Sequence, residues 1–144
     1  MVIEMYLLDT NICIYLMKHH PESVAKRFES LLVGDVAISS ITLAELEHGV
    51  FLDPAMQIVR QNALNRLLDL LLVLDFDKHA ARAYGKLRSQ KIQLGRHRFD
   101  VLIAAHAIAL RIVLVTNNIK DFKGIPGLAL ENWVTGEKIG HQAL

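Results

Sequence analysis

Three acidic residues follow short apolar runs of the chain, and a fourth opens a helical stretch. They are Asp9 after residues 5–8, Glu45 after residues 36–38, Asp100 at the start of a helical stretch, and Asp121 after residues 112–115. Such runs are too short for helices and nearly free of polar residues, as buried parallel strands are. The carboxyl ends of parallel strands meet at one edge of a sheet, where helix N-termini also gather. We therefore expect the four carboxylates to lie together at one rim.

Carboxylates gathered in this way predict a metal site. Three or four of them repel one another at neutral pH unless a cation offsets their charge. An all-oxygen ligand set favours hard divalent ions such as Mg²⁺ or Mn²⁺. Such ions activate water and screen the negative charge that develops when a phosphodiester is hydrolysed. The four acids therefore predict metal-assisted hydrolysis of a phosphodiester, without a covalent enzyme intermediate.

Each acid also has a purely structural explanation. Asp9 can cap a helix that begins near residue 11, and Glu45 fits a capping box with Thr42. Asp100 suits the first turn of a helix, where the helix dipole favours acids, and Asp121 suits a turn. Their joint placement after successive strands favours a shared site, because independent caps would produce that placement only by accident.

The elements that position these acids alternate along the chain. Apolar runs predict strands at residues 5–8, 36–38, 72–74 and 112–115. Helical spacing of apolar residues predicts helices at residues 23–32, 42–52, 56–70, 78–94 and 100–110. A strand-helix succession requires a parallel sheet with helices on both faces. We predict an α/β protein, with a three-layer α/β/α arrangement around a central parallel sheet of four to five strands, and residues 1–144 as a single domain.

The composition agrees with one compact unit in a reducing compartment. The 144 residues are 52% hydrophobic, which is enough for a core, and the formal net charge of +1 excludes no class of partner. Cys13 has no second cysteine with which to form a disulfide and no metal-ligand spacing, so we expect a small buried side chain and a cytoplasmic protein. No segment approaches the roughly 18 apolar residues of a membrane span, and Glu4 stands where a basic leader would begin.

Around the acidic residues the sequence resembles a known family. The segments that carry the resemblance are Leu7-Leu8-Asp9-Thr10-Asn11, residues 38–45, residues 100–107, residues 114–118 with Asp121-Phe122, and Glu131-Asn132-Trp133. They resemble VapC-type toxins, which are ribonucleases of the PIN-domain family. The likeness runs in order through nearly the whole chain. It implies a PIN-like fold for this sequence.

The resemblance also assigns roles to individual residues. It implies a catalytic and metal-binding quartet of Asp9, Glu45, Asp100 and Asp121. Glu45 is favoured over Glu47 only by the resemblance, because helical phase does not separate the two. Asp9, Asp100 and Asp121 would hold the metal, and Glu45 would orient or deprotonate the attacking water. Thr116 and Asn117 would support the site through hydrogen bonds.

The activity and the partners that the resemblance implies are specific. It implies an endoribonuclease that depends on Mg²⁺, with Mn²⁺ as an alternative, and that cleaves cellular RNA such as tRNA as the toxin of a toxin–antitoxin pair. It implies a homodimer silenced by a VapB-type antitoxin, and contact with operator DNA only through the antitoxin complex. The apolar surfaces of the helices at residues 23–32 and 56–70 are candidates either for such partners or for the core. We expect no membrane partner.

A basic segment precedes Asp100. Residues 78–99 contain no Asp or Glu, and the candidate RNA-binding residues are Arg82, Lys86, Arg96 and Arg98. Lysines and arginines of this kind hold a nucleic-acid backbone, although a solvated helix face is the other explanation. Family members often have a small-residue turn, such as Gly-Pro, before the third acid. Here Gly95 is followed by bulky residues, so the resemblance does not define this substrate-side loop.

Other classes of protein also place acids at strand ends. A receiver-like phospho-acceptor domain would carry two adjacent acids after its first strand and a lysine after its last, and neither is present. A phosphatase of the haloacid-dehalogenase type would need an aspartate where Asn11 stands. A PIN-like protein that acts mainly by binding, within a partner complex on DNA, remains the alternative. No acid-base partner is evident for His48, His79 or His97, and His106 is expected to be a packed or hydrogen-bonded structural residue.

Overall fold

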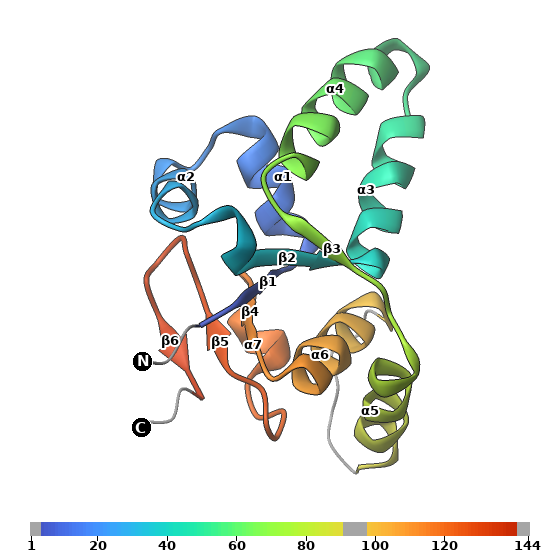
Figure 1. Cartoon of the computed structure of the whole chain (residues 1–144), viewed down its shortest axis with the longest axis vertical. Coiled ribbons are helices and arrows are strands. Elements are labelled where there is room, and N and C mark those ends of the chain that lie inside the picture. Colours follow the sequence, from blue (N-terminus) through green and yellow to red (C-terminus); the bar gives the residue numbers. More distant parts are fainter. Residues whose placement is uncertain (1–3, 91–97, 141–144) are drawn as a thin grey trace.

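The structure is a computed structural model that describes residues 4–90 and 98–140. A six-stranded sheet forms its centre (Figure 1). In spatial order the strands are β3 (Leu72–Leu74), β2 (Val36–Ser39), β1 (Tyr6–Leu8), β4 (Val113–Val115), β5 (Leu130–Glu131) and β6 (Lys138–Ile139). Neighbouring strands from β3 to β5 pair in parallel, and β6 pairs with β5 in the antiparallel direction. The parallel sheet predicted from the sequence is confirmed.

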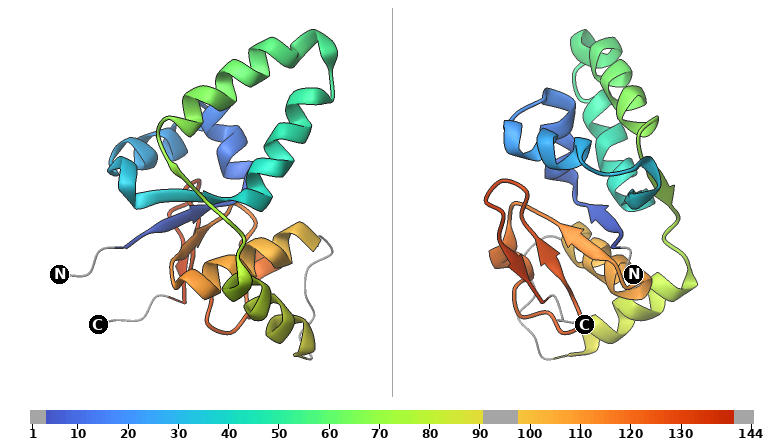
Figure 2. Two further views of the ribbon diagram at one scale, coloured as in Figure 1. Left: turned by 45° about the vertical axis from the view of Figure 1, so that its right-hand side comes forward. Right: turned by 60° about the vertical axis from the view of Figure 1, so that its left-hand side comes forward.

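Helices cover both faces of this sheet. One face carries α1 (Thr10–Lys18), α2 (Glu22–Glu29), α3 (Ser40–Phe51) and α4 (Gln57–Leu68). The other carries α5 (Lys78–Ser89), α6 (Arg98–Leu110) and α7 (Ile119–Phe122). Short 3-10 turns at Val33–Asp35 and Pro54–Met56 precede β2 and α4. Figure 2 shows the two sets of helices on opposite sides of the sheet, as the alternating sequence pattern predicted.

Burial on both faces explains the apolar runs of β1, β2 and β4, whereas the edge strand β3 leaves Leu72 and Val73 exposed. In β1, Tyr6 and Leu8 pack into the core under α1 to α4, whereas Leu7 packs into the core against α6 and α7. Successive side chains of a strand point to opposite faces, so a strand between two layers needs apolar residues at every position. Full burial of a side chain such as leucine contributes about 1.5–3 kcal/mol to stability. Cys13 is buried in the first of these cores, as expected.

The last two strands were not predicted. Each has two residues, which is too short to give a period, and β5 includes the charged Glu131. That carboxylate is buried, with 2% of its surface exposed, and it accepts hydrogen bonds from Trp133 Nε1 at 3.0 Å and from Arg27 Nη2 at 3.3 Å. The Arg27 guanidinium also lies over the rings of Tyr6 and Trp133. Charge compensation therefore allows an acidic residue in a buried strand.

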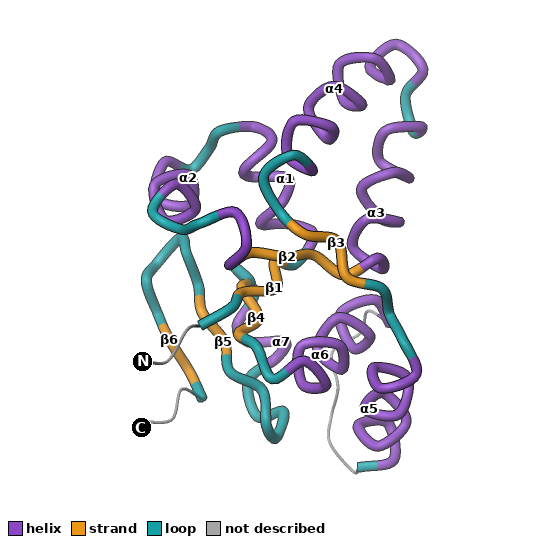
Figure 3. The backbone as a smooth tube through the Cα atoms, in the orientation of Figure 1, coloured by secondary structure: helices purple, strands orange, loops and turns teal. Residues whose placement is uncertain are grey.

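Helices α3 and α4 extend from the sheet as an antiparallel arm, which the backbone trace shows clearly (Figure 3). The end of the arm exposes large apolar side chains, namely Phe51, Leu52, Ile58 and Val59. Apolar groups in such a patch are unusual on a protein that functions alone. Among the described residues, no helix is both long and apolar enough to cross a membrane.

Candidate active site

Asp9 is placed by both the sheet and the first helix. Its backbone N–H donates to Val115 O at 3.0 Å, which continues the pairing of β1 with β4. Its carboxylate Oδ1 accepts from Ile12 N at 3.0 Å and so caps α1. The capping explanation for Asp9 is therefore confirmed. A cap uses only part of a carboxylate's capacity to accept hydrogen bonds, so it leaves Asp9 available for a second role.

The surroundings of Asp9 oppose its ionisation. Burial raises the pKa of Asp9 to about 6, with 5% of the residue exposed. Hydrogen bonds from the Thr116 hydroxyl and Ile12 N lower this pKa, and the charges of Asp100 and Glu45 raise it. The latter two acids therefore lie close enough to act on Asp9. Within the described residues, no lysine, arginine or histidine forms an ion pair with it.

Glu45 points back toward α1 and does not cap its own helix. The cap of α3 is Ser39, whose hydroxyl accepts from Ile41 N at 3.1 Å, so the predicted capping box with Thr42 is wrong. Instead, Thr10 Oγ1 donates to Glu45 Oε1 at 2.7 Å. This bond orients the carboxylate beside the residue that follows Asp9. Sequence reasoning missed Thr10, although its position next to Asp9 was a signal.

Asp100 and Asp121 approach the same rim from the other layer. Asp100 is partly buried in the first turn of α6, and its charge acts on Asp9. Asp121 lies in α7 and accepts a hydrogen bond from Asn118 Nδ2. Asn118 N in turn donates to Thr116 Oγ1 at 3.0 Å, and the Thr116 hydroxyl donates to Asp9. The structure thus links Asp121 to Asp9 through hydrogen bonds, and brings Glu45 and Asp100 close to Asp9 directly.

Asn117 holds the loop after β4 against two other elements. Its Nδ2 donates to the Tyr15 hydroxyl at 3.1 Å, and its Oδ1 accepts from Asn132 Nδ2 at 3.3 Å. Asn132 belongs to a segment that carries the family resemblance but was given no role from the sequence, and Tyr15 was not singled out. Both predicted supporting residues, Thr116 and Asn117, therefore make hydrogen bonds at this rim.

A buried histidine braces the helices that carry two of the acids. His106 Nδ1 lies 2.8 Å from Ser39 Oγ, at the start of α3, and its ring meets the edge of Phe76. Burial lowers the pKa of His106, which favours the neutral ring. The structural role expected for His106 is therefore confirmed. Because Asp100 is on α6 with His106, this bond ties α6 to the helix of Glu45.

The donor set at the rim has the chemistry of a hard cation site. Its side-chain oxygens come from Asp9, Glu45, Asp100 and Asp121, and such ligands suit Mg²⁺ or Mn²⁺. Among the described residues, no three His, Cys, Asp or Glu side chains already converge as metal ligands do. Burial is the main cause of the raised pKa of Asp9, and a bound cation would offset the smaller contribution from the charges of Asp100 and Glu45.

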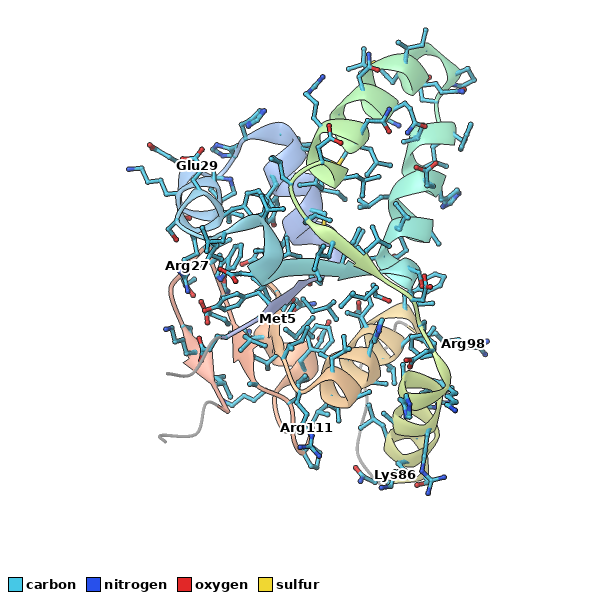
Figure 4. The ribbon with its side chains drawn as sticks, viewed as in Figure 1. Met5, Arg27, Glu29, Lys86, Arg98 and Arg111 are labelled. Carbon is cyan, nitrogen blue, oxygen red and sulfur yellow. The ribbon has the colours of Figure 1, made fainter. Side chains whose placement is uncertain are left out.

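The predicted basic residues separate into two groups. Arg98 is exposed at the first residue of α6, two residues before Asp100, and Arg96 lies outside the described residues. Arg82 and Lys86 are exposed on α5. Figure 4 shows Lys86 well separated from Arg98. Among the described candidates, Arg98 is therefore the one next to an acid of the quartet, and Arg82 and Lys86 lie on a different helix.

The fold and the acidic rim define a class of protein. A family model for the PIN domain matches residues 6–128, and the chain belongs to the PIN-domain family. Among curated proteins, it is 46% identical over 131 residues to "Ribonuclease VapC2" of Rickettsia felis, covering 89% of this chain and 97% of that protein. It is 38% identical to "tRNA(fMet)-specific endonuclease VapC" of Shigella flexneri, with the same coverage.

Solved structures give the same result. The chain matches VapBC2 from Rickettsia felis bound to a DNA fragment from their promoter, with a TM-score of 0.82 and 45% identity. It also matches DNA-bound VapBC from Salmonella typhimurium, with a TM-score of 0.83 and 35% identity. Each match covers 90% of this chain and 98% of the other. The predicted resemblance is therefore confirmed.

Proposed function

We propose that this protein is a metal-dependent endoribonuclease and the toxin of a toxin–antitoxin pair. The observation that carries the proposal is the buried Asp9 carboxylate, on which the charges of Asp100 and Glu45 act and which itself forms no ion pair among the described residues. A fold does not select such an arrangement for stability, because it costs free energy. Curated relatives with 37% to 46% identity are called ribonucleases or endonucleases.

The four acids divide the catalytic work in this proposal. Asp9, Asp100 and Asp121 would hold Mg²⁺ or Mn²⁺, and Glu45 completes the quartet. The chemistry that such an ion would supply when bound is activation of water and compensation of charge on the phosphate. Glu45, oriented by Thr10, accepts a proton from the attacking water.

The substrate in this proposal is RNA, with tRNA as the first candidate. The Shigella flexneri and Salmonella typhimurium relatives are called tRNA(fMet)-specific endonucleases. Arg98 lies near Asp100 and meets the backbone beside the cleaved bond, together with Arg96. Arg82 and Lys86 contact a part of the RNA that lies away from the cleaved bond. Phosphate contacts of this kind supply affinity that falls as salt is raised.

Two apolar grooves suit a VapB-type antitoxin. One, of about 400 Å³, lies between α1, α2 and α4, with Phe28, Leu32 and Leu70 in its lining. The other, of about 420 Å³, lies between α1, α3 and α4 and includes Glu45 in its lining. An apolar segment in the second groove would contact Glu45, the one member of the quartet that lines it. We propose a homodimer that acts in the cytoplasm and meets operator DNA only through its antitoxin.

The experiment that tests the proposal is RNA cleavage by the purified protein. Structured RNAs, including tRNAs, are incubated with Mg²⁺ or Mn²⁺ beside an EDTA control, an Asp9→Asn variant and an Asp53→Asn variant. Asp53 caps the turn at Pro54–Met56 as Asp9 caps α1, so it controls for the loss of a capping charge. We expect discrete products that require metal, persist in Asp53→Asn and disappear in Asp9→Asn.

The alternative is a protein that acts by binding within a partner complex on DNA. Two solved relatives are DNA-bound VapBC complexes, which gives this alternative its basis. If no RNA is cleaved, or if Asp9→Asn cleaves as well as the unchanged protein, the ribonuclease proposal fails. Operator binding by the chain with its antitoxin would then be measured.

A further inference from the structure

A further concave site, separate from the two apolar grooves, lies on α5 in the opposite layer. It has a volume of about 330 Å³. His79, Arg82 and Lys86 line it from one face of α5, since their spacing follows the helical repeat, and Gln90 lines it from just beyond the end of the helix. Ile108 and Pro126 form its apolar wall. We call this the α5 pocket.

The charge of the α5 pocket favours an anion. No acidic residue is among the described residues that line it. Arg82 and Lys86 are exposed, and within the described residues neither forms an ion pair. They lie four residues apart on one helix, where like charges repel. A bound phosphate would relieve that repulsion, and the apolar wall offers a surface for a sugar or a base.

The α5 pocket is distinct from the acidic rim. Helix α6 carries Asp100 in its first turn and leads the chain back to the start of β4, at the opposite edge of the sheet. Ile108 is eight residues beyond Asp100, which corresponds to about 12 Å along the helix axis. Figure 4 shows Lys86 toward the end of α5, far from Arg98. A ligand in this pocket therefore does not occupy the carboxylate rim.

We propose that the α5 pocket binds the RNA substrate through a backbone phosphate outside the cleaved segment. The proposal rests on the ribonuclease function, and it divides the substrate contacts into two sites. Arg98 serves the rim, and Arg82 with Lys86 serves the pocket. RNA that is long enough to reach both sites binds more tightly than RNA that reaches only the rim.

The test compares a long and a short substrate. The variant Arg82→Gln/Lys86→Gln removes the charge of the pocket. The variant Lys78→Gln/Arg88→Gln removes the same charge from α5 at exposed positions outside the pocket lining. With full-length tRNA, we expect the pocket variant to raise KM about tenfold at unchanged kcat, and to reduce the salt dependence of binding by about one phosphate contact per residue. With a short oligoribonucleotide that reaches only the rim, we expect the pocket variant to raise KM no more than the control variant does.

The proposal is overturned if the two variants have equal KM values on tRNA. It is also overturned if the pocket variant raises KM on the short RNA by as much as it does on tRNA. If the unchanged protein cleaves neither RNA, the ribonuclease function has failed, and tRNA binding by the Asp9→Asn variant then decides on the pocket alone. Weaker tRNA binding after removal of the pocket charges supports the pocket. A loss of affinity for operator DNA with unchanged affinity for tRNA assigns the pocket to DNA and overturns it.

Discussion

Asp9 and Glu131 are both buried acids of the central sheet region, and they have opposite surroundings. Glu131 faces Arg27 and Trp133, which donate to its Oε1. Asp9 also accepts hydrogen bonds, but the charges nearest to it are those of Asp100 and Glu45. The first arrangement offsets the cost of burying a charge, and the second adds to it. A buried acid beside a cation thus has a structural role, whereas a buried acid among other acids indicates a candidate cation-binding site.

The largest expected effect comes from breaking the compensated pair. Arg27→Met keeps most of the aliphatic packing and removes the cation, so Glu131 stays buried without its charge partner. We expect the free energy of unfolding at pH 7 to fall by about 3 kcal/mol, measured by urea denaturation. Lys26→Met, on the same helix in an exposed pair with Glu22, is the control and should change stability by under about 1 kcal/mol. Equal effects would remove the distinction between the two acids.

Substitution of Asp9, the acid without an ion-pair partner, is expected to raise the free energy of unfolding. The pKa of Asp9 is raised to about 6 in the folded protein, so stability falls as pH rises from near 4 to about 6 and then stays constant. Asp9→Asn removes that cost while an amide oxygen still caps α1. In EDTA at pH 7 we expect the variant to be more stable by up to about 3 kcal/mol, and the gain to vanish near pH 4. A variant less stable than the unchanged protein at pH 7 contradicts this.

Metal at high concentration should reverse the order of stability of these two proteins. A cation that binds only the folded chain raises the free energy of unfolding by about 4.1 kcal/mol at 1,000 times its Kd, which exceeds the gain of about 3 kcal/mol expected in Asp9→Asn. We expect Mn²⁺ or Mg²⁺ to raise the Tm of the unchanged protein and to leave that of Asp9→Asn nearly constant. Thermal denaturation at a series of Mn²⁺ concentrations measures these Tm values. Equal Tm shifts in both proteins would show that the ion binds away from Asp9.

The smallest effect on stability, with a clear effect on catalysis, is expected at Thr10. Thr10→Val keeps the volume of the side chain and removes the hydroxyl that orients Glu45. We expect kcat for RNA cleavage to fall about tenfold, as is typical for groups that orient a metal site. Thr135→Val removes a hydroxyl that accepts from Glu137 N in an exposed turn, and it should leave kcat unchanged. A loss of the same size in both variants would deny Thr10 an orienting role.

The sequence predicted the strands that have continuous apolar runs. The runs at 36–38 and 72–74 became β2 and β3 with changes of at most one residue at an end. Strand β2 is buried between two layers, which admits few polar side chains, whereas the edge strand β3 leaves Leu72 and Val73 exposed, so burial does not explain its apolar run. Strands β5 and β6 escaped prediction since their pairing depends on tertiary contacts. The helix predicted at residues 78–94 ends at Ser89, where Gln90 turns to extended backbone. Residues 91–94 lie outside the described part of the chain.

The site was predicted to the extent that strand ends determine it. Asp9 and Asp100 come together because one follows a strand and the other begins a helix at the same edge of the sheet. The bond from Thr10 to Glu45 joins residues 35 positions apart, and that from Asn117 to Tyr15 joins residues 102 apart. Contacts of that kind depend on how layers pack, and no local period records them.

The α3–α4 arm bears on how the protein behaves when its partner is scarce. Ile58 is 77% exposed, and Phe51, Leu52 and Val59 form an apolar surface with it at the end of the arm. Surfaces of this kind adhere to one another in water, so self-association limits the concentration of the free chain. Overproduction without a partner should therefore yield precipitate before it yields much free enzyme. Low solubility would then limit the concentration of the free protein.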